Sequence, residues 1–224
     1  MTISIIGRCA QTGQLGIAIS SSSIAVGARC PWLRSKVGAV STQNITLPAL
    51  GPRILDRLQQ GESVETALKS GLDTDDYSLY RQVTVLTAGG ESAFYSGEKT
   101  LGVNNALSGE NCVAAGNMLA DPNVIVAMIN AFEQQSGHLA DRLIAAMQAG
   151  LRAGGEAGPL HSAAMSIVDS HVWPIVDLRV DWADADPIDE LGKLWHAYQP
   201  QMQDYLTRAL DPRSAPGYGV PGDE

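Results

Sequence analysis

Residues 2–23 read TISIIGRCAQTGQLGIAISSSS, and this stretch decides the fold class. β-Branched residues alternate along 2–8, a polar turn with one glycine occupies 11–14, and apolar residues return along 15–20. Two short strands joined by a tight turn predict an antiparallel β-hairpin. The serines at 20–23 lie in a small, polar segment that is poor in helix formers, so we expect the second strand to pass into a loop there.

The same reasoning extends along the chain. Two further hairpins are predicted, at 82–87 with 92–96 and at 163–169 with 172–178, together with single strands at 37–44 and 112–115. Helices are predicted over 48–61, over 63–72 with Ser63 as cap, after Asp121-Pro122, over 139–153, and after Asp186-Pro187, the last broken or kinked at Pro200. Hairpins pair strands antiparallel, and no strict strand–helix alternation occurs, so the order favours sheets covered by helical layers over a Rossmann fold.

Composition narrows the function classes. The chain has 224 residues, 45% of them apolar, and a formal net charge of -9. This predicts one domain over 1–211, followed by an irregular Pro/Gly-rich tail over 212–224. An acidic chain without a Lys/Arg cluster is a poor partner for nucleic acid or an anionic membrane. The three cysteines are widely spaced and no signal peptide or spanning segment is visible, so we expect a cytoplasmic protein without cofactor or metal.

Thr2 is the first candidate for chemistry. Methionine aminopeptidase removes Met1 when the second residue is small, which would leave Thr2 with both a hydroxyl and a free α-amine. An α-amine has a pKa of about 7.7–8.0, so it can accept the hydroxyl proton near neutral pH. An ordinary structural threonine in a strand is the alternative interpretation.

The sequence resembles a bacterial family, the domain of unknown function 1028, which is placed in the N-terminal nucleophile (Ntn) hydrolase superfamily. The segments that carry this resemblance are Thr2–Ile6, Leu15–Ser22, Ala25–Ala28, Val37–Gln43, Gly51–Arg53, Tyr80–Gln82, Ala115–Leu119, His161–Ala163 and Val176–Asp181. The resemblance covers about residues 1–212. It implies an α+β fold, a four-layer αββα sandwich of two mainly antiparallel sheets covered by helices.

The resemblance also implies a site. In the superfamily the nucleophile is the first residue of a strand, which is the position of Thr2 once Met1 is lost. Proteasome-like members carry an Asp and a Lys on the following strands. Here serines 20–23 stand near the Asp position, and Arg29, Arg34 or Lys36 must replace the Lys, with Arg29 favoured because it lies between strands.

Other polar residues at strand ends complete the prediction. Asn44 and Asn117 are candidate oxyanion donors, because acyl transfer needs N–H groups aimed at the developing charge. The candidate substrate-binding residues are Ser21, Ser22, Thr42, Gln43 and His161. Each of these residue types is also a common turn former or a structural hydrogen-bonding group.

Three hypotheses follow. The first is a hydrolase that cleaves an amide bond of a small or peptide-like substrate, with Thr2 as nucleophile. The second is a binding or regulatory protein that keeps the fold without catalysis. The third is a hydrolase that retains Met1 and uses an internal Ser or Cys of residues 20–30. A homodimer is expected only because symmetric dimers are common among soluble proteins.

Overall fold

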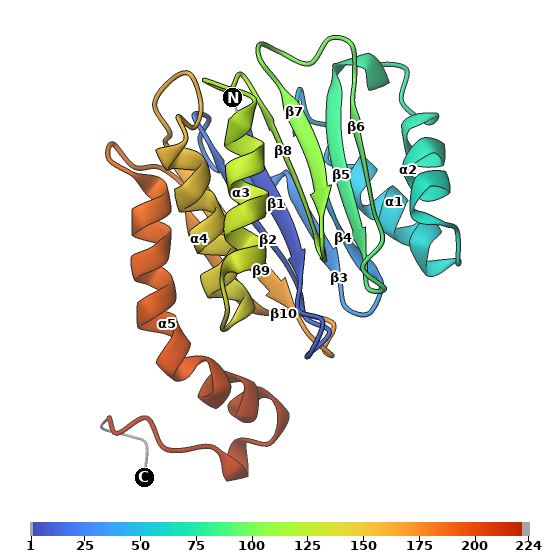
Figure 1. Ribbon diagram of the computed structural model, residues 1–224. Coiled ribbons are helices and arrows are strands. Elements are labelled where there is room, and N and C mark those ends of the chain that lie inside the picture. Colours follow the sequence, from blue (N-terminus) through green and yellow to red (C-terminus); the bar gives the residue numbers. More distant parts are fainter. Residues whose placement is uncertain (1, 221–224) are drawn as a thin grey trace.

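The protein is an α+β sandwich of two antiparallel sheets (Figure 1), described here by a computed structural model that covers residues 2–220. The larger sheet has the strand order β10-β9-β2-β1-β8-β7, and the smaller has the order β3-β4-β5-β6. The strands of the larger sheet are β1 (Thr2–Arg8), β2 (Leu15–Ser21), β7 (Asn105–Gly109), β8 (Cys112–Asn117), β9 (Ser162–Val168) and β10 (Pro174–Val180). Those of the smaller sheet are β3 (Pro31–Arg34), β4 (Gly38–Asn44), β5 (Arg81–Thr87) and β6 (Ser92–Ser96).

Helices cover the outer face of each sheet, which gives four layers. The smaller sheet is covered by α1 (Leu50–Gln59) and α2 (Val64–Leu72). The larger is covered by α3 (Asn123–Gln134), α4 (Leu139–Arg152) and α5 (Pro187–Leu210). Short 3₁₀ turns occupy Val26–Ala28, Ser78–Tyr80 and Pro212–Ser214. No helix among residues 2–220 is long and apolar enough to cross a membrane.

Strand β1 lies in the middle of the larger sheet. Its successive side chains point alternately toward the covering helices and toward the smaller sheet. Ile3 and Ile5 belong to the core beneath α3 and α4, whereas Ile6 packs between the sheets with Leu86 of β5. Gly7 permits the close helix contact, because a Cβ there would lie 2.4 Å from the Phe132 ring. The side chains of Thr2 and Ser4 therefore share the inner face with Ile6.

Most of the predicted elements are confirmed. The three hairpins form antiparallel pairs, and the caps at Ser63 and Asp186 accept the expected backbone N–H bonds. The predicted cap of α3 is Asp121 with Pro122 as the first helical residue, but the N-cap is Pro122 and the helix begins one residue later, at Asn123. Strands β3 and β7 were not predicted.

The predicted interruption at Pro200 takes the form of a bend. The helix α5 is continuous from Pro187 to Leu210, and Figure 1 shows it changing direction part-way along. Proline removes one backbone donor and crowds the preceding turn, which bends a helix without necessarily ending it. The predicted tail at 212–224 extends past the described residues at 221–224, and Met1 also lies outside them.

Candidate functional site

Thr2 begins the central strand and lies between two neighbouring strand ends. It is directly opposite Ser21, the last residue of β2, and Asn117, the last residue of β8. Its residue is only 6% exposed. Three polar side chains from three strands, those of Thr2, Ser21 and Asn117, are thus brought together at one end of the larger sheet. We call this group the Thr2 cluster.

A chain of hydroxyl contacts runs outward from Thr2. Its Oγ1 lies 3.2 Å from Ser21 Oγ, which lies 3.0 Å from Ser23 Oγ. The guanidinium of Arg29 donates to Ser23 Oγ at 2.9 Å and to the backbone carbonyls of Ile24 and Ala25. Arg29 therefore reaches Thr2 through two serines.

Arginine only donates, so Ser23 Oγ is the acceptor in that contact, while either hydroxyl can be the donor in the Ser23–Ser21 and Ser21–Thr2 contacts; one consistent order starts at Arg29. Ser23 Oγ accepts from Arg29, so its own proton is available to Ser21 Oγ. Ser21 Oγ also accepts from the backbone N–H of Ser23 at 3.1 Å, which leaves its own proton available for Thr2 Oγ1. In this arrangement Thr2 Oγ1 accepts a hydrogen bond and can give its own proton elsewhere.

A buried amide network joins this end of the larger sheet to the smaller sheet. Ser4 Oγ donates to Gln43 Oε1 at 2.7 Å, and Gln43 Nε2 donates to Gln82 Oε1 at 2.8 Å. Asn117 Nδ2 donates to the same Gln82 oxygen at 3.1 Å. Gln82 in turn donates through Nε2 to Gly116 O at 3.0 Å.

This network fixes the orientation of Asn117. Gln82 Oε1 can only accept, so the nitrogen of the Asn117 amide must face it. Asn117 Oδ1 then points elsewhere, and it is buried without a hydrogen-bond partner among the described residues. Buried acceptors are normally hydrogen-bonded, so this oxygen is a site where a further donor can bind.

Glu156 is a second buried acceptor at the same end of the sheet. Its backbone forms a bridge with Leu119, two residues after Asn117. The residue is 6% exposed, and neither carboxyl oxygen has a hydrogen-bond partner of good geometry among residues 2–220. Burial raises the pKa of Glu156 to about 8, against the opposing effects of the charge of the chain's amino terminus and the Ser22 backbone N–H.

The comparisons with known proteins identify the family. A model described as a family of unknown function, DUF1028, matches residues 2–191. The chain belongs to the DUF1028 family. A crystal structure of the DUF1028 protein SPO2555 from Silicibacter pomeroyi superposes with a TM-score of 0.82 at 28% identity, covering 88% of this chain and 89% of that one.

A more distant similarity is to Anbu, an ancestral β-subunit, from Yersinia bercovieri. The TM-score is 0.44 at 10% identity, with 97% of this chain and 100% of that chain covered, which is too low to support an argument. No curated protein matches the sequence.

Several predicted site residues of this DUF1028 chain have structural partners outside the Thr2 cluster. Asn44 adopts a left-handed backbone with φ of 71°, donates through Nδ2 to Tyr80 O, and accepts from the Leu101 N–H. Thr42 points the opposite way from Gln43 and contacts Thr46. These two residues hold the turn after β4.

His161 and Ser22 lie on the loop side of the cluster. The backbone N–H of His161 donates to Ser21 O, but its ring stacks on Trp182 at 4.2 Å and its Nδ1 lies 2.9 Å from Ala183 O. Ser22 approaches Glu156 through its backbone. Both residues support the segments around the cluster with main-chain contacts.

The internal cysteine of the third hypothesis is poorly suited to nucleophilic attack. Burial raises the pKa of Cys30 to about 11, so its thiol stays protonated at neutral pH. In the described part of the chain, no three His, Cys, Asp or Glu side chains are grouped so that they could hold a metal ion.

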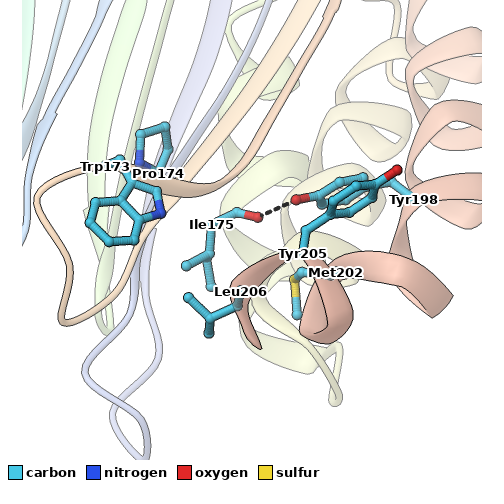
Figure 2. Close-up of a pocket in the computed structure, with 7 residues that line it drawn as sticks. All are labelled: Trp173, Pro174, Ile175, Tyr198, Met202, Tyr205 and Leu206. Carbon is cyan, nitrogen blue, oxygen red and sulfur yellow. Dashed lines mark hydrogen bonds between the residues drawn. The ribbon is translucent and has the colours of Figure 1, made fainter. Parts of the chain in front are cut away.

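Two cavities of similar size lie at opposite ends of the larger sheet. One, of about 300 Å³, is lined by Glu156 and by residues from the α4–β9 and β10–α5 connections. The other, of about 340 Å³, is aromatic and lies between the start of β10 and the far half of α5 (Figure 2). The start of β10 is connected through β9 and β2 to Arg8, the last residue of β1, so the aromatic cavity is remote from Thr2.

Proposed function

We propose that this DUF1028 protein is an N-terminal nucleophile hydrolase, a member of that superfamily, which cleaves an amide bond of a small or peptide-like substrate. Thr2, exposed as the first residue by removal of Met1, is the nucleophile. The observation that carries this proposal is the contact chain from Arg29 through Ser23 and Ser21 to Thr2 Oγ1. A structural threonine needs no such chain.

The reaction uses the amine and the hydroxyl of one residue. The α-amine accepts the proton of Thr2 Oγ1 as the oxygen bonds to the substrate carbonyl carbon. The tetrahedral intermediate collapses, the C–N bond breaks, and the leaving nitrogen takes the proton from the ammonium. Water then attacks the resulting ester, which releases the acid and restores the hydroxyl.

The surrounding residues supply hydrogen bonds to charge that develops during this reaction. We assign Ser21 as the donor to Thr2 Oγ1, and the Arg29 charge then polarises that donor through Ser23. One N–H of the Asn117 amide is committed to Gln82, and we assign the other to the oxyanion. Gln43 holds the Gln82 amide in the orientation that this assignment requires.

A catalytically inactive binding protein is the second candidate. The observation in its favour is the burial of Thr2, which is 6% exposed and lines neither of the two cavities described above. Under this alternative the polar cluster would only stabilise the strand ends.

Intact-mass measurement and a β-lactone acylating probe test the proposal. We expect natively expressed protein to lack Met1 and to form a covalent adduct on Thr2. Thr2→Ala should abolish the adduct and Thr2→Ser should retain it. Both variants keep a small second residue, so Met1 removal is unaffected and the hydroxyl alone is compared. Retention of Met1 together with equal labelling of Thr2→Ala would refute the proposal and leave the binding protein.

A further inference from the structure

We propose that Glu156 is a positioning residue that binds the α-amine of Thr2 and stabilises the ammonium formed when this amine takes the hydroxyl proton. The inference rests on the proposed function and names the acidic partner that the cluster requires. Sequence reasoning missed Glu156, which lies in a Gly-rich connection between α4 and β9.

The position of Glu156 supports this role. Its backbone pairs with Leu119, just beyond β8, and the Ser22 backbone, just beyond β2, faces its carboxyl. Asn117 and Ser21, the ends of these two strands, flank Thr2. The charge of the chain's amino terminus already acts on this carboxyl. Loss of Met1 transfers the amine to Thr2, the first residue of β1.

Glu156 has no cationic partner among the described side chains that share its cavity. The titratable residues there are Asp184 and Asp186, both acidic. Asp184 accepts from Trp182 Nε1, and Asp186 caps α5 by accepting two backbone N–H groups. Neither can neutralise a buried carboxylate, and a buried charge requires a partner.

A second acceptor also lacks a donor at this place. Asn117 Oδ1 is buried without a hydrogen-bond partner among residues 2–220, and Asn117 lies directly opposite Thr2 on the neighbouring strand. An ammonium carries three donors and no acceptor. One ammonium on Thr2 is therefore the kind of group that both acceptors lack.

The acid and the amine also titrate in the same range. Burial raises the pKa of Glu156 to about 8, and an α-amine ordinarily has a pKa of about 7.7–8.0. Moving a proton between groups of matched pKa costs little free energy, so the pair of ammonium and Glu156 carboxylate is accessible near neutral pH.

The test measures the α-amine directly in protein that begins at Thr2, as verified by intact mass. Reductive methylation with formaldehyde and cyanoborohydride across pH 5–10, followed by mass spectrometry of the N-terminal peptide, gives the pKa of the amine. Glu156→Gln should lower this pKa by about one unit or more, since a neutral amide cannot stabilise the ammonium. The pH midpoint of β-lactone labelling should move down with it. Asp184→Asn, in the same cavity, should change neither.

If the extent of reductive methylation of the α-amine depends on pH in the same way in wild type and Glu156→Gln, the inference is overturned. Glu156→Met, which removes the charge with a different side chain, replaces Glu156→Gln if thermal melting shows that the latter is unfolded. The amine measurement does not depend on catalysis. The amine pKa can differ between wild type and Glu156→Gln even if wild type forms no Thr2 adduct. That result would refute the proposed function and leave the pairing of Glu156 with the amine intact.

Discussion

The hydroxyls of Thr2 and Ser21 face each other at 3.2 Å across the first two strands of the larger sheet. Directly opposite residues in an antiparallel pair share one face, so this contact is a consequence of the hairpin register. A shift of one residue in the pairing would place the two hydroxyls on opposite faces of the sheet. The geometry of the candidate nucleophile is therefore set by the first hairpin.

Ser21→Ala should slow β-lactone labelling of Thr2 by about ten- to a hundredfold, the equivalent of a hydrogen bond to developing charge worth roughly 1.5–3 kcal/mol. The measurement is the rate of adduct formation by intact mass. Ser20→Ala is the matched control, because Ser20 donates to Ser162 O and lies on the other face of the strand. Equal slowing by both variants would mean that the loss reflects general damage to β2.

Arg29→Lys should make the loop around Ser23 more mobile. A lysine ammonium cannot reproduce the guanidinium that donates to Ser23 Oγ and to two backbone carbonyls of this loop. Faster amide hydrogen exchange of Ser23 and Val26 is the expected result. Arg34→Lys serves as control, since Arg34 contacts Asp56 and Gln59 at the surface and none of the residues around Ser23. Unchanged protection of Ser23 in Arg29→Lys would contradict the role assigned to the guanidinium.

Gln82→Leu should reduce the free energy of unfolding by about 2–4 kcal/mol, because it leaves the buried amide nitrogens of Gln43 and Asn117 without an acceptor. Urea denaturation measures the loss. Thr84→Val, on the same strand, removes a buried hydroxyl that has no partner among the described residues and should be neutral or stabilising. A similar destabilisation by the two variants would argue against the network.

Glu156 should make the protein less stable as the pH rises. Its pKa is raised from 4.5 to about 8 in the folded state. Between these values the folded protein holds a proton that the unfolded chain has released, so stability is greatest below the lower value and declines until the pH passes about 8. Urea unfolding at pH 5 to 9 should show a loss of several kcal/mol in protein that retains Met1, the form to which this pKa applies. The loss should be nearly absent in Glu156→Gln, and parallel pH profiles would contradict the shift.

Much of the fold could be predicted because local signals agreed with the tertiary structure. The alternation of Thr2–Arg8 and the caps at Ser63 and Asp186 each specify one local conformation. Strand β3 was missed because it is four residues long and begins with proline, and β7 because Asn105–Gly109 carries little apolar alternation. These strands form because they pair with β4 and β8, and such pairing depends on the tertiary structure rather than on the local sequence.

The site was predictable only in part. Thr2, Ser21, Arg29 and Asn117 lie on ends of strands or next to them, where hairpin reasoning places them. Glu156 carries no motif, and its burial results from the packing of the α4–β9 connection against the residues after β8. A local sequence pattern contains no trace of such a contact.

The amide network between the sheets also has a consequence for folding. Gln43, Gln82 and Asn117 satisfy one another only when the two sheets meet in a single alignment. A misaligned encounter would bury several amides without partners, at about 1–3 kcal/mol for each. The network therefore favours one alignment of the two sheets during folding, because compact states that would suit the apolar residues alone are destabilised when these amides lack partners. Its loss would leave a sandwich with several competing ways to close.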